Sequence, residues 1–174
     1  MFTYQFTRRY SMAHRLISGF SEKCATPHGH NELVTISLET PADFSLDAKS
    51  NMFAEFSMLK SRWHEWIDHH VDHALQLSQF DPLIQWFTTH EPQRCQRLLI
   101  TPGDPTTECL AACFHAKINA FLAKAAIGLT CQEILIEETP TNHIRLKAPA
   151  HHQWFHQITG DYWWNRPDMS INDL

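Results

Sequence analysis

The sequence predicts an α+β fold, in which an antiparallel sheet is covered on one face by helices. Two long segments near the N-terminus alternate in hydrophobicity as strands do, and amphipathic helical segments with shorter strand-like segments follow them. The segments form no regular series of strand, helix and strand, so a parallel sheet is not expected. With 174 residues, of which 43% are hydrophobic and 19% charged, the chain can bury one core.

The two long strands are predicted at residues 2–14 and 29–39. In the first of them, large side chains keep one parity: Phe2, Tyr4, Phe6, Tyr10, Met12 and His14. A loop that holds Cys24 and Pro27 joins the two segments, which we expect to pair as antiparallel neighbours. Residues 41–50 form a polar connection to the segments that follow.

Two helices and a strand come next. Apolar side chains recur at helical spacing over residues 53–70, which predicts a long amphipathic helix. Asp81 as the cap and Pro82 in the first turn begin a short helix that runs to about His90. Residues 95–100 are predicted to form the third strand.

The last regular elements are a helix and two strands. Thr106 or Thr107 can cap this helix, which ends near Gly128. Residues 132–138 are predicted as the fourth strand and residues 143–147 as a short fifth one.

An aromatic-rich tail ends the sequence. Its large side chains show little periodicity: Trp154, Phe155, Tyr162, Trp163 and Trp164. Such side chains more often pack against the body of a protein or a neighbouring subunit than bind a ligand. We therefore predict a domain over residues 1–148 and an extension, residues 149–174, that packs on this domain or on a neighbouring subunit.

Composition excludes several classes of protein. The net charge is −5 with neutral histidines, and no basic block offsets it, so a nucleic-acid partner is disfavoured. The first residues contain no long apolar run, which argues against a signal peptide or membrane span and favours the cytoplasm. The five cysteines lack the spacing of a disulfide framework, in agreement with a reducing compartment.

Three histidines form the most informative chemical pattern. His28 and His30 are two residues apart on a predicted strand, so their side chains point to the same face. If the strand that ends at His14 is their neighbour, three imidazoles meet, which is the ligand count of a catalytic zinc with an open fourth position. Zinc is preferred because imidazole suits it and no redox ligand set is visible. Cys24 could then act as a base beside the metal.

A histidine-rich helix end, residues 64–73, offers further candidates. His69 and His73 have the spacing of a chelating pair, but a solvated helix face is the simpler interpretation. Asp72 and His73 could form a carboxylate–histidine pair, an arrangement typical of a general acid or base near neutral pH. Because adjacent residues on a helix do not face each other, such a pair needs an irregular helix terminus.

Two polar motifs lie near the predicted strand and helix ends. Residues 105–108 look first like a helix cap. Glu137 and Glu138 face opposite ways at a strand end, so one could lie in solvent while the other receives paired N–H donors from a heterocycle.

Together these motifs resemble the 6-pyruvoyltetrahydropterin synthase family, in the family's order and over about residues 6–148. The resemblance implies the tunnelling fold, with an antiparallel sheet and helices in each subunit, trimers that close a barrel, and usually two stacked trimers. The matching site residues fall into four roles: the zinc ligands His14, His28 and His30, the catalytic thiol of Cys24, the second proton-transfer unit Asp72 and His73, supplied across a subunit interface, and the pterin-binding residues Glu138, Thr106 and Thr107.

The gap between Cys24 and His28 indicates a branch of the family. Three intervening residues look like the bacterial 6-carboxytetrahydropterin synthases of the queuosine pathway, whereas the animal pyruvoyl enzymes have a longer gap. The implied reaction converts 7,8-dihydroneopterin triphosphate to 6-carboxytetrahydropterin, acetaldehyde and triphosphate. The sequence departs from the family at Glu32, where an aromatic residue is common, and at residues 75–77, where a Leu-Asn ending is frequent.

Three alternatives remain open at this point. The pyruvoyl synthase reaction eliminates triphosphate without carbon–carbon cleavage. A side-chain aldolase would act on unphosphorylated dihydroneopterin. A non-catalytic oligomer that binds metal or pterin would have kept the scaffold without turnover.

Overall fold

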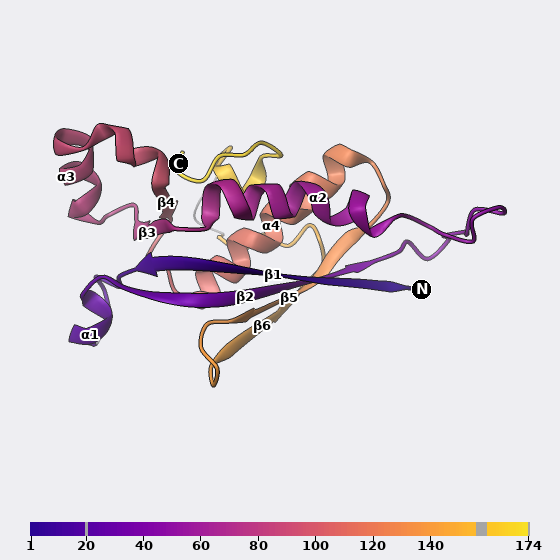
Figure 1. Cartoon of the computed structure of the whole chain (residues 1–174), viewed down its shortest axis with the longest axis horizontal. Helices are drawn as coiled ribbons and strands as arrows, with labels where there is room; N and C mark the ends of the chain where they lie inside the picture. The colour runs from indigo at the N-terminus through magenta and orange to yellow at the C-terminus, as the bar shows by residue number, and fades with distance from the viewer. Residues whose placement is uncertain (20, 156–159, 174) are drawn as a thin grey trace.

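The computed structural model describes residues 1–19, 21–155 and 160–173. Over these residues the chain forms a six-stranded sheet in the order β4-β3-β1-β2-β5-β6, with helices α2 and α4 on one face (Figure 1). The elements in chain order are β1 (Thr3–His14), α1 (Glu22–Ala25), β2 (His28–Glu39), α2 (Phe56–Trp66), a π-helix (Ile67–Val71), β3 (Ala74–Ser78), α3 (Pro82–His90), a 3-10 helix (Pro92–Arg97), β4 (Leu98–Thr101), α4 (Thr107–Ala125), β5 (Thr130–Glu137), β6 (His143–Lys147) and a 3-10 turn (Trp163–Asn165).

The predicted α+β class is confirmed, but the antiparallel sheet is only partly correct. β1, β2, β5 and β6 pair antiparallel, whereas β3 pairs parallel with β1, and β4 parallel with β3. The sequence patterns do not predict β3. The predicted helix ends at residue 70, and residues 74–78 belong to no predicted element. The crossover through α3 makes the β3–β4 pairing parallel.

Two element boundaries were also wrong. The long helix predicted over residues 53–70 begins at Phe56 and changes to a π-helix at Ile67. The strand predicted from Cys95 begins only at Leu98, since Pro92 opens a 3-10 helix that includes Cys95. The predicted cap of α3 is confirmed, because Asp81 accepts a hydrogen bond from the Leu83 N–H.

The β1–β2 hairpin positions the three histidines. Its register pairs Tyr10 with Glu32, Met12 with His30, and His14 with His28. Even-numbered residues of both strands face the helices and are mostly buried, as alternation requires. The core under α2 and α4 is aromatic, and its fully buried side chains include Trp63, Trp66, Phe114 and Trp163.

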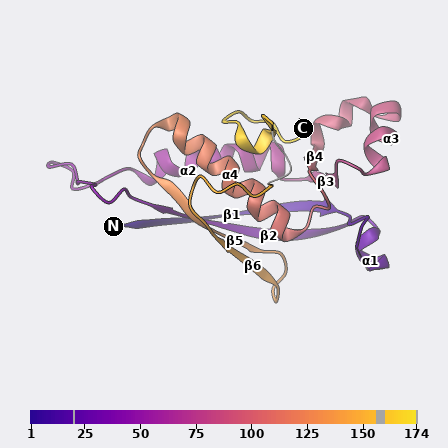
Figure 2. The same ribbon diagram turned by 180° about the vertical axis from the view of Figure 1, so that it is seen from behind.

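The tail from residue 160 joins this core. Trp163 and Trp164 are buried, and the Trp163 indole N–H donates to the Ile100 carbonyl oxygen at 2.7 Å. The Ile100 N–H in turn donates to the Ile171 carbonyl oxygen at 3.0 Å. Figure 2 shows the tail beside α4, on the helical side of the sheet. Both backbone groups of this β4 residue are therefore bonded to the tail.

The Lys117 ammonium is buried on α4. It donates to the Trp163 carbonyl oxygen at 2.8 Å and lies 3.3 Å from a carboxylate oxygen of Asp168. It also lies 5.6 Å from the centre of the Trp66 ring. Burial lowers the pKa of Lys117 to about 8, against the raising effect of Asp168. Within the described residues, no helix is both long and apolar enough to cross a membrane.

Candidate active site

The structure brings the three predicted histidines together at one end of the β1–β2 hairpin. The Nε2 atoms of His14 and His28 are 3.1 Å apart, and one nitrogen from each of the three rings lies within 4.8 Å of the others. The ring centroids of His14 and His28 lie 4.6 Å apart, and His30 lies 5.2 and 5.1 Å from them. Among the described residues this is the one group of His, Cys, Asp or Glu with the geometry of a metal site.

Hydrogen bonds fix which nitrogen of the His14 and His28 rings faces the group. The Nδ1 of His14 lies 3.0 Å from the Pro105 carbonyl oxygen, and the Nδ1 of His28 lies 2.9 Å from that of Thr26. A carbonyl oxygen only accepts, so Nδ1 carries the hydrogen in each ring and Nε2 of the neutral ring is left with its lone pair. Carbonyl partners of this kind orient metal-ligating histidines.

This arrangement fits a cation. Two Nε2 lone pairs at 3.1 Å repel each other unless a positive charge lies between or beside them. Burial lowers the pKa of His14, which favours the neutral ring that a metal requires. The three-histidine group can therefore hold a metal ion, and a donor set of imidazole nitrogens suits zinc.

Gly29, between two of the histidines, is needed for strand pairing. A Cβ built at this position would lie 2.6 Å from the Met12 carbonyl oxygen on β1. No side chain fits at that distance. Only glycine therefore lets β1 and β2 approach each other between His28 and His30.

A cavity of about 400 Å³ opens beside the histidines. Its walls come from the ends of β1 and β5, the starts of β2, β6 and α4, and the short helix α1. The residues that line it are His14, Leu16, Cys24, His28, His30, Thr106, Thr107, Glu108, Glu138, Thr139, Asn142, His143 and Ile144. The structure thus gathers seven of the nine predicted site residues around one cavity.

Cys24 reaches the cavity from α1 and is half-buried. Its loop is tied to the rest of the chain by backbone contacts: the Leu16 N–H donates to the Cys24 carbonyl oxygen at 2.8 Å. The Asp104 carboxylate accepts hydrogen bonds from the N–H groups of Ile17 and Ser18 at 3.1 and 2.7 Å. The thiol is therefore held on an anchored loop beside the three histidines.

Glu138 follows β5 and lines the same cavity. Its carboxylate accepts a hydrogen bond from the Thr107 hydroxyl at 2.8 Å, and its backbone N–H donates to the Asn142 carbonyl oxygen. Thr106 has a different role, because its hydroxyl caps α4 by accepting from the Cys109 N–H at 3.2 Å. Thr107 orients the carboxylate, while Thr106 fixes the helix end that carries Thr107.

Glu32 lies in the buried layer next to the site, and the sequence marked it only as a family departure. It is fully buried, accepts a hydrogen bond from the Tyr10 hydroxyl, and has one carboxyl oxygen with no partner among the described residues. Burial raises the pKa of Glu32 to about 7, and the charge of Glu138 adds to this effect. The available signal was its parity, which places an acid on the inward face two residues after His30.

Asp72 and His73 form the predicted pair but do not line this cavity. The Nδ1 of His73 lies 2.8 Å from a carboxylate oxygen of Asp72, whose other oxygen accepts from the Ser11 N–H at 2.7 Å. Burial raises the pKa of Asp72, but the hydrogen bonds from Ser11 and His73 outweigh it, so that pKa lies below its usual value. The His73 side chain is 73% exposed, so the pair faces outward from its own chain.

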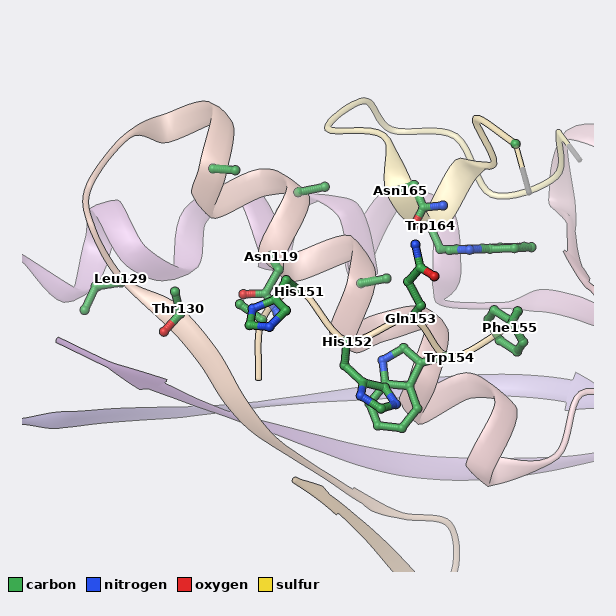
Figure 3. A pocket seen from close by; sticks show the side chains of 15 residues that line it. Asn119, Leu129, Thr130, His151, His152, Gln153, Trp154, Phe155, Trp164 and Asn165 are labelled. Carbon is green, nitrogen blue, oxygen red and sulfur yellow. The ribbon is translucent and has the colours of Figure 1, made fainter. Parts of the chain in front are cut away.

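A larger cavity of about 600 Å³ lies elsewhere, between α4 and the tail (Figure 3). Its wall includes Asn119 on α4 and the tail residues His151, His152, Trp154 and Trp164. It shares no lining residue with the histidine cavity. The described side chains around it include neither a cysteine nor a carboxylate, so we place the candidate active site at the smaller cavity.

Comparisons with known proteins found relatives of similar sequence. A 6-carboxy-5,6,7,8-tetrahydropterin synthase of Rickettsia felis is 29% identical over 140 residues, 77% of this chain and 93% of that protein. The enzyme of the same name from Rickettsia bellii is 31% identical over 118 residues, 66% of this chain and 78% of that protein.

Solved structures share the fold. A 6-pyruvoyl tetrahydropterin synthase of Caenorhabditis elegans has a TM-score of 0.56 at 24% identity and covers 84% of this chain and 95% of its own. An uncharacterized protein of Wolinella succinogenes has a TM-score of 0.63 at 18% identity over 84% of this chain and 99% of its own. The sequence model described as 6-pyruvoyl tetrahydropterin synthase matches residues 3–149, and the chain belongs to this family.

Proposed function

We propose that the protein is a zinc-dependent 6-carboxytetrahydropterin synthase, a carbon–carbon lyase. It would convert 7,8-dihydroneopterin triphosphate and water to 6-carboxytetrahydropterin, acetaldehyde and triphosphate. The observation that carries the proposal is the single cavity in which three histidines, a cysteine and a threonine-bound glutamate meet. The names of the Rickettsia relatives support the same reaction.

Glu138 is the group that would hold the pterin ring. A carboxylate accepts two parallel N–H bonds from a planar heterocycle, which fixes the orientation of the ring as well as its affinity. The Thr107 hydroxyl holds one carboxylate oxygen at 2.8 Å, so the carboxylate is oriented before the ring arrives. The side chain of the substrate would then extend toward the histidines and Cys24.

His14, His28 and His30 would hold the zinc, which when bound acts as a Lewis acid on a substrate oxygen and makes a bound hydroxyl more acidic. Cys24 is the nearest candidate for the base that removes a proton from the substrate side chain. A cysteine acts as a base in its thiolate form, which nearby positive charge favours. Its anchored loop keeps the sulfur at the cavity wall.

Asp72 and His73 would move the second proton in the cavity of a neighbouring subunit. In its own chain this pair does not line the cavity, while His73 is exposed and its Nδ1 is held by Asp72. A homo-oligomer, a trimer or a dimer of trimers, would bring the pair to the site of the next chain. We expect this assembly to work in the cytoplasm on a small pterin, without nucleic acid or membrane.

The test is incubation of the purified, zinc-loaded protein with 7,8-dihydroneopterin triphosphate, with products identified by mass. Acetaldehyde and 6-carboxytetrahydropterin are expected. Triphosphate release without acetaldehyde would identify the pyruvoyl synthase reaction instead. Cleavage of only unphosphorylated dihydroneopterin would identify an aldolase. Binding of pterin without turnover of either compound would leave a non-catalytic oligomer.

A further inference from the structure

The segment that leads into Asp72 and His73 is irregular. After α2 the chain winds as a π-helix over Ile67–Val71, and the Asp72 N–H closes it by donating to the Ile67 carbonyl oxygen at 2.7 Å. The next residue, His73, has a φ of 62°, in the left-handed region that is costly for a residue with a Cβ. Such a conformation persists only when surrounding contacts hold it, so the contacts of this peptide are decisive.

Arg97 provides one set of these contacts from the 3-10 helix before β4. Its guanidinium donates to the His69 carbonyl oxygen at 2.8 Å and to the Asp72 carbonyl oxygen at 2.5 Å. Both oxygens lie at the C-terminal end of the π-helix, where carbonyls lack partners and a positive charge is favourable. The planar guanidinium can reach two carbonyls at once, which a lysine ammonium on a flexible chain does less well.

Ser11 on β1 provides the other set. The His73 N–H donates to the Ser11 carbonyl oxygen at 2.7 Å, and the Ser11 N–H donates to the Asp72 carboxylate at 2.7 Å. The Asp72 carbonyl and the His73 N–H belong to one peptide unit. Arg97 therefore holds one end of this unit and Ser11 the other, and the orientation of the unit sets the φ of His73.

We propose that Arg97 is a positioning residue for His73. By fixing the Asp72–His73 peptide, it keeps the His73 Nδ1–H directed at the Asp72 carboxylate and leaves Nε2 facing outward. A proton-transfer group must present one nitrogen in one orientation, and the hydrogen bond at the other nitrogen selects the tautomer. The catalytic part of this inference rests on the proposed function, whereas the positioning part concerns the chain alone.

The test compares Arg97→Met and Arg97→Lys with a matched control, Arg94→Met. Arg94 lies in the same 3-10 helix, is exposed, and pairs with Glu91 rather than with the π-helix. Two-bond ¹⁵N–¹H correlation spectra of the zinc-loaded, ¹⁵N-histidine-labelled proteins report the tautomer of each imidazole, and a His73→Asn sample assigns the His73 signals. Turnover of dihydroneopterin triphosphate gives kcat and KM separately.

In Arg97→Met we expect His73 to lose its Nδ1–H tautomer signature and kcat to fall by about 10- to 100-fold, with KM unchanged. Arg97→Lys, which keeps the charge and one donor, should lie between Met and the parent, and it is the informative variant if Arg97→Met does not fold. Arg94→Met should match the parent in both measurements.

The inference would be overturned if the His73 signals of Arg97→Met matched those of the parent. If Arg97→Met does not fold, parent-like His73 signals in Arg97→Lys would overturn it. The inference would also be overturned if Arg94→Met shifted the His73 signals as much as Arg97→Met does. If the parent protein does not turn over the pterin, the proposed function fails, but the imidazole spectra still decide the role of Arg97.

Discussion

At the scale of single residues, Cys24 can be separated from the metal ligands. It shares the cavity with the three histidines but does not belong to their nitrogen cluster. Cys24→Ala should therefore keep zinc and pterin binding while turnover falls by at least about 100-fold, the usual contribution of a general base. Zinc content by mass spectrometry, pterin binding by calorimetry and a turnover assay check the three parts.

Cys95→Ala is the matched control, because Cys95 is also half-buried but lies outside the cavity. It should keep full turnover. His28→Ala should instead lose the metal. Parent-like turnover in Cys24→Ala would remove this residue from the mechanism.

The Thr107 hydroxyl offers a second residue-scale prediction. It donates the hydrogen bond that orients the Glu138 carboxylate, at 2.8 Å. Thr107→Val keeps the shape but loses this donor, and a hydrogen bond to a charged group contributes about 1.5–3 kcal/mol. KM for the pterin should rise by about tenfold or more, as measured by steady-state kinetics.

Thr141→Val serves as the control for Thr107→Val. Thr141 is exposed in the β5–β6 turn and does not line the cavity. An unchanged KM in Thr107→Val would show that the carboxylate needs no such support.

At the scale of elements, the β1–β2 hairpin depends on Gly29. A Cβ there meets the Met12 carbonyl oxygen at 2.6 Å, and backbone on a paired strand cannot move away cheaply. Gly29→Ala should lower the free energy of unfolding by about 1–3 kcal/mol, the usual cost of overpacking. It should also weaken zinc binding, because His28 and His30 shift with the strand.

Gly103→Ala is a control from the same chain, since a Cβ at Gly103 meets nothing within 4 Å. Denaturant unfolding of both variants in zinc-free buffer measures the stability difference. Equal stability of the two variants would contradict the close approach of β1 and β2.

The same scale shows what could be predicted from sequence. The parity of β1 and β2 placed His14, His28 and His30 on one face, because strand alternation is a local rule and the two strands are neighbours in the chain. β3 was missed because its inward position is a polar residue, Gln76, and because its partners β1 and β4 lie far along the chain. Parallel pairing of distant segments leaves no local signal.

Chemical properties that depend on burial could also not be predicted from the sequence. Parity placed Glu32 on the inward face, but only the packed structure shows that it is fully buried, with one oxygen lacking a partner among the described residues. Arg97 is a similar case, since its role depends on a π-helix that periodicity does not reveal. Helix caps such as Thr106 were predictable because capping is local.

At the scale of the whole molecule, the buried Lys117, which bonds to the tail, should make the free energy of unfolding depend on pH. Burial lowers its folded pKa to about 8, from about 10.4 in an unfolded chain. Between these values the unfolded state binds more protons than the folded state, so the free energy of unfolding should rise with pH from about 8 to 10.4. Below pH 8 the full cost of burying the charge applies, on the order of 3 kcal/mol.

Lys117→Met should abolish this rise, whereas Lys124→Met, at an exposed position of the same helix, should keep it. Thermal unfolding monitored by circular dichroism at several pH values between about 7 and about 10.5 measures both. A rise that is identical in the two variants would show that other groups titrate instead.

Assembly allows a further test at this scale. If His73 serves the cavity of the next chain, Cys24→Ala and His73→Asn should each be inactive alone. Mixed after dissociation and reassembly, they should recover about a quarter of the parent activity, because about one site in four combines an intact Cys24 with an intact His73. Absence of recovery, with mixed oligomers shown by native mass spectrometry, would place both groups in one chain.

The bonding of Ile100 to the tail has a practical consequence for truncation. β4 lies at the rim of the sheet, and Trp163 and Ile171 occupy the acceptor and the donor of its Ile100 backbone. A shortened chain that stops before residue 160 would expose the hydrophobic edge strand β4, which could then pair with strands of other molecules. Such a protein would precipitate before any loss of its histidine cluster became measurable, so shortened versions are poor material for studying the chemistry.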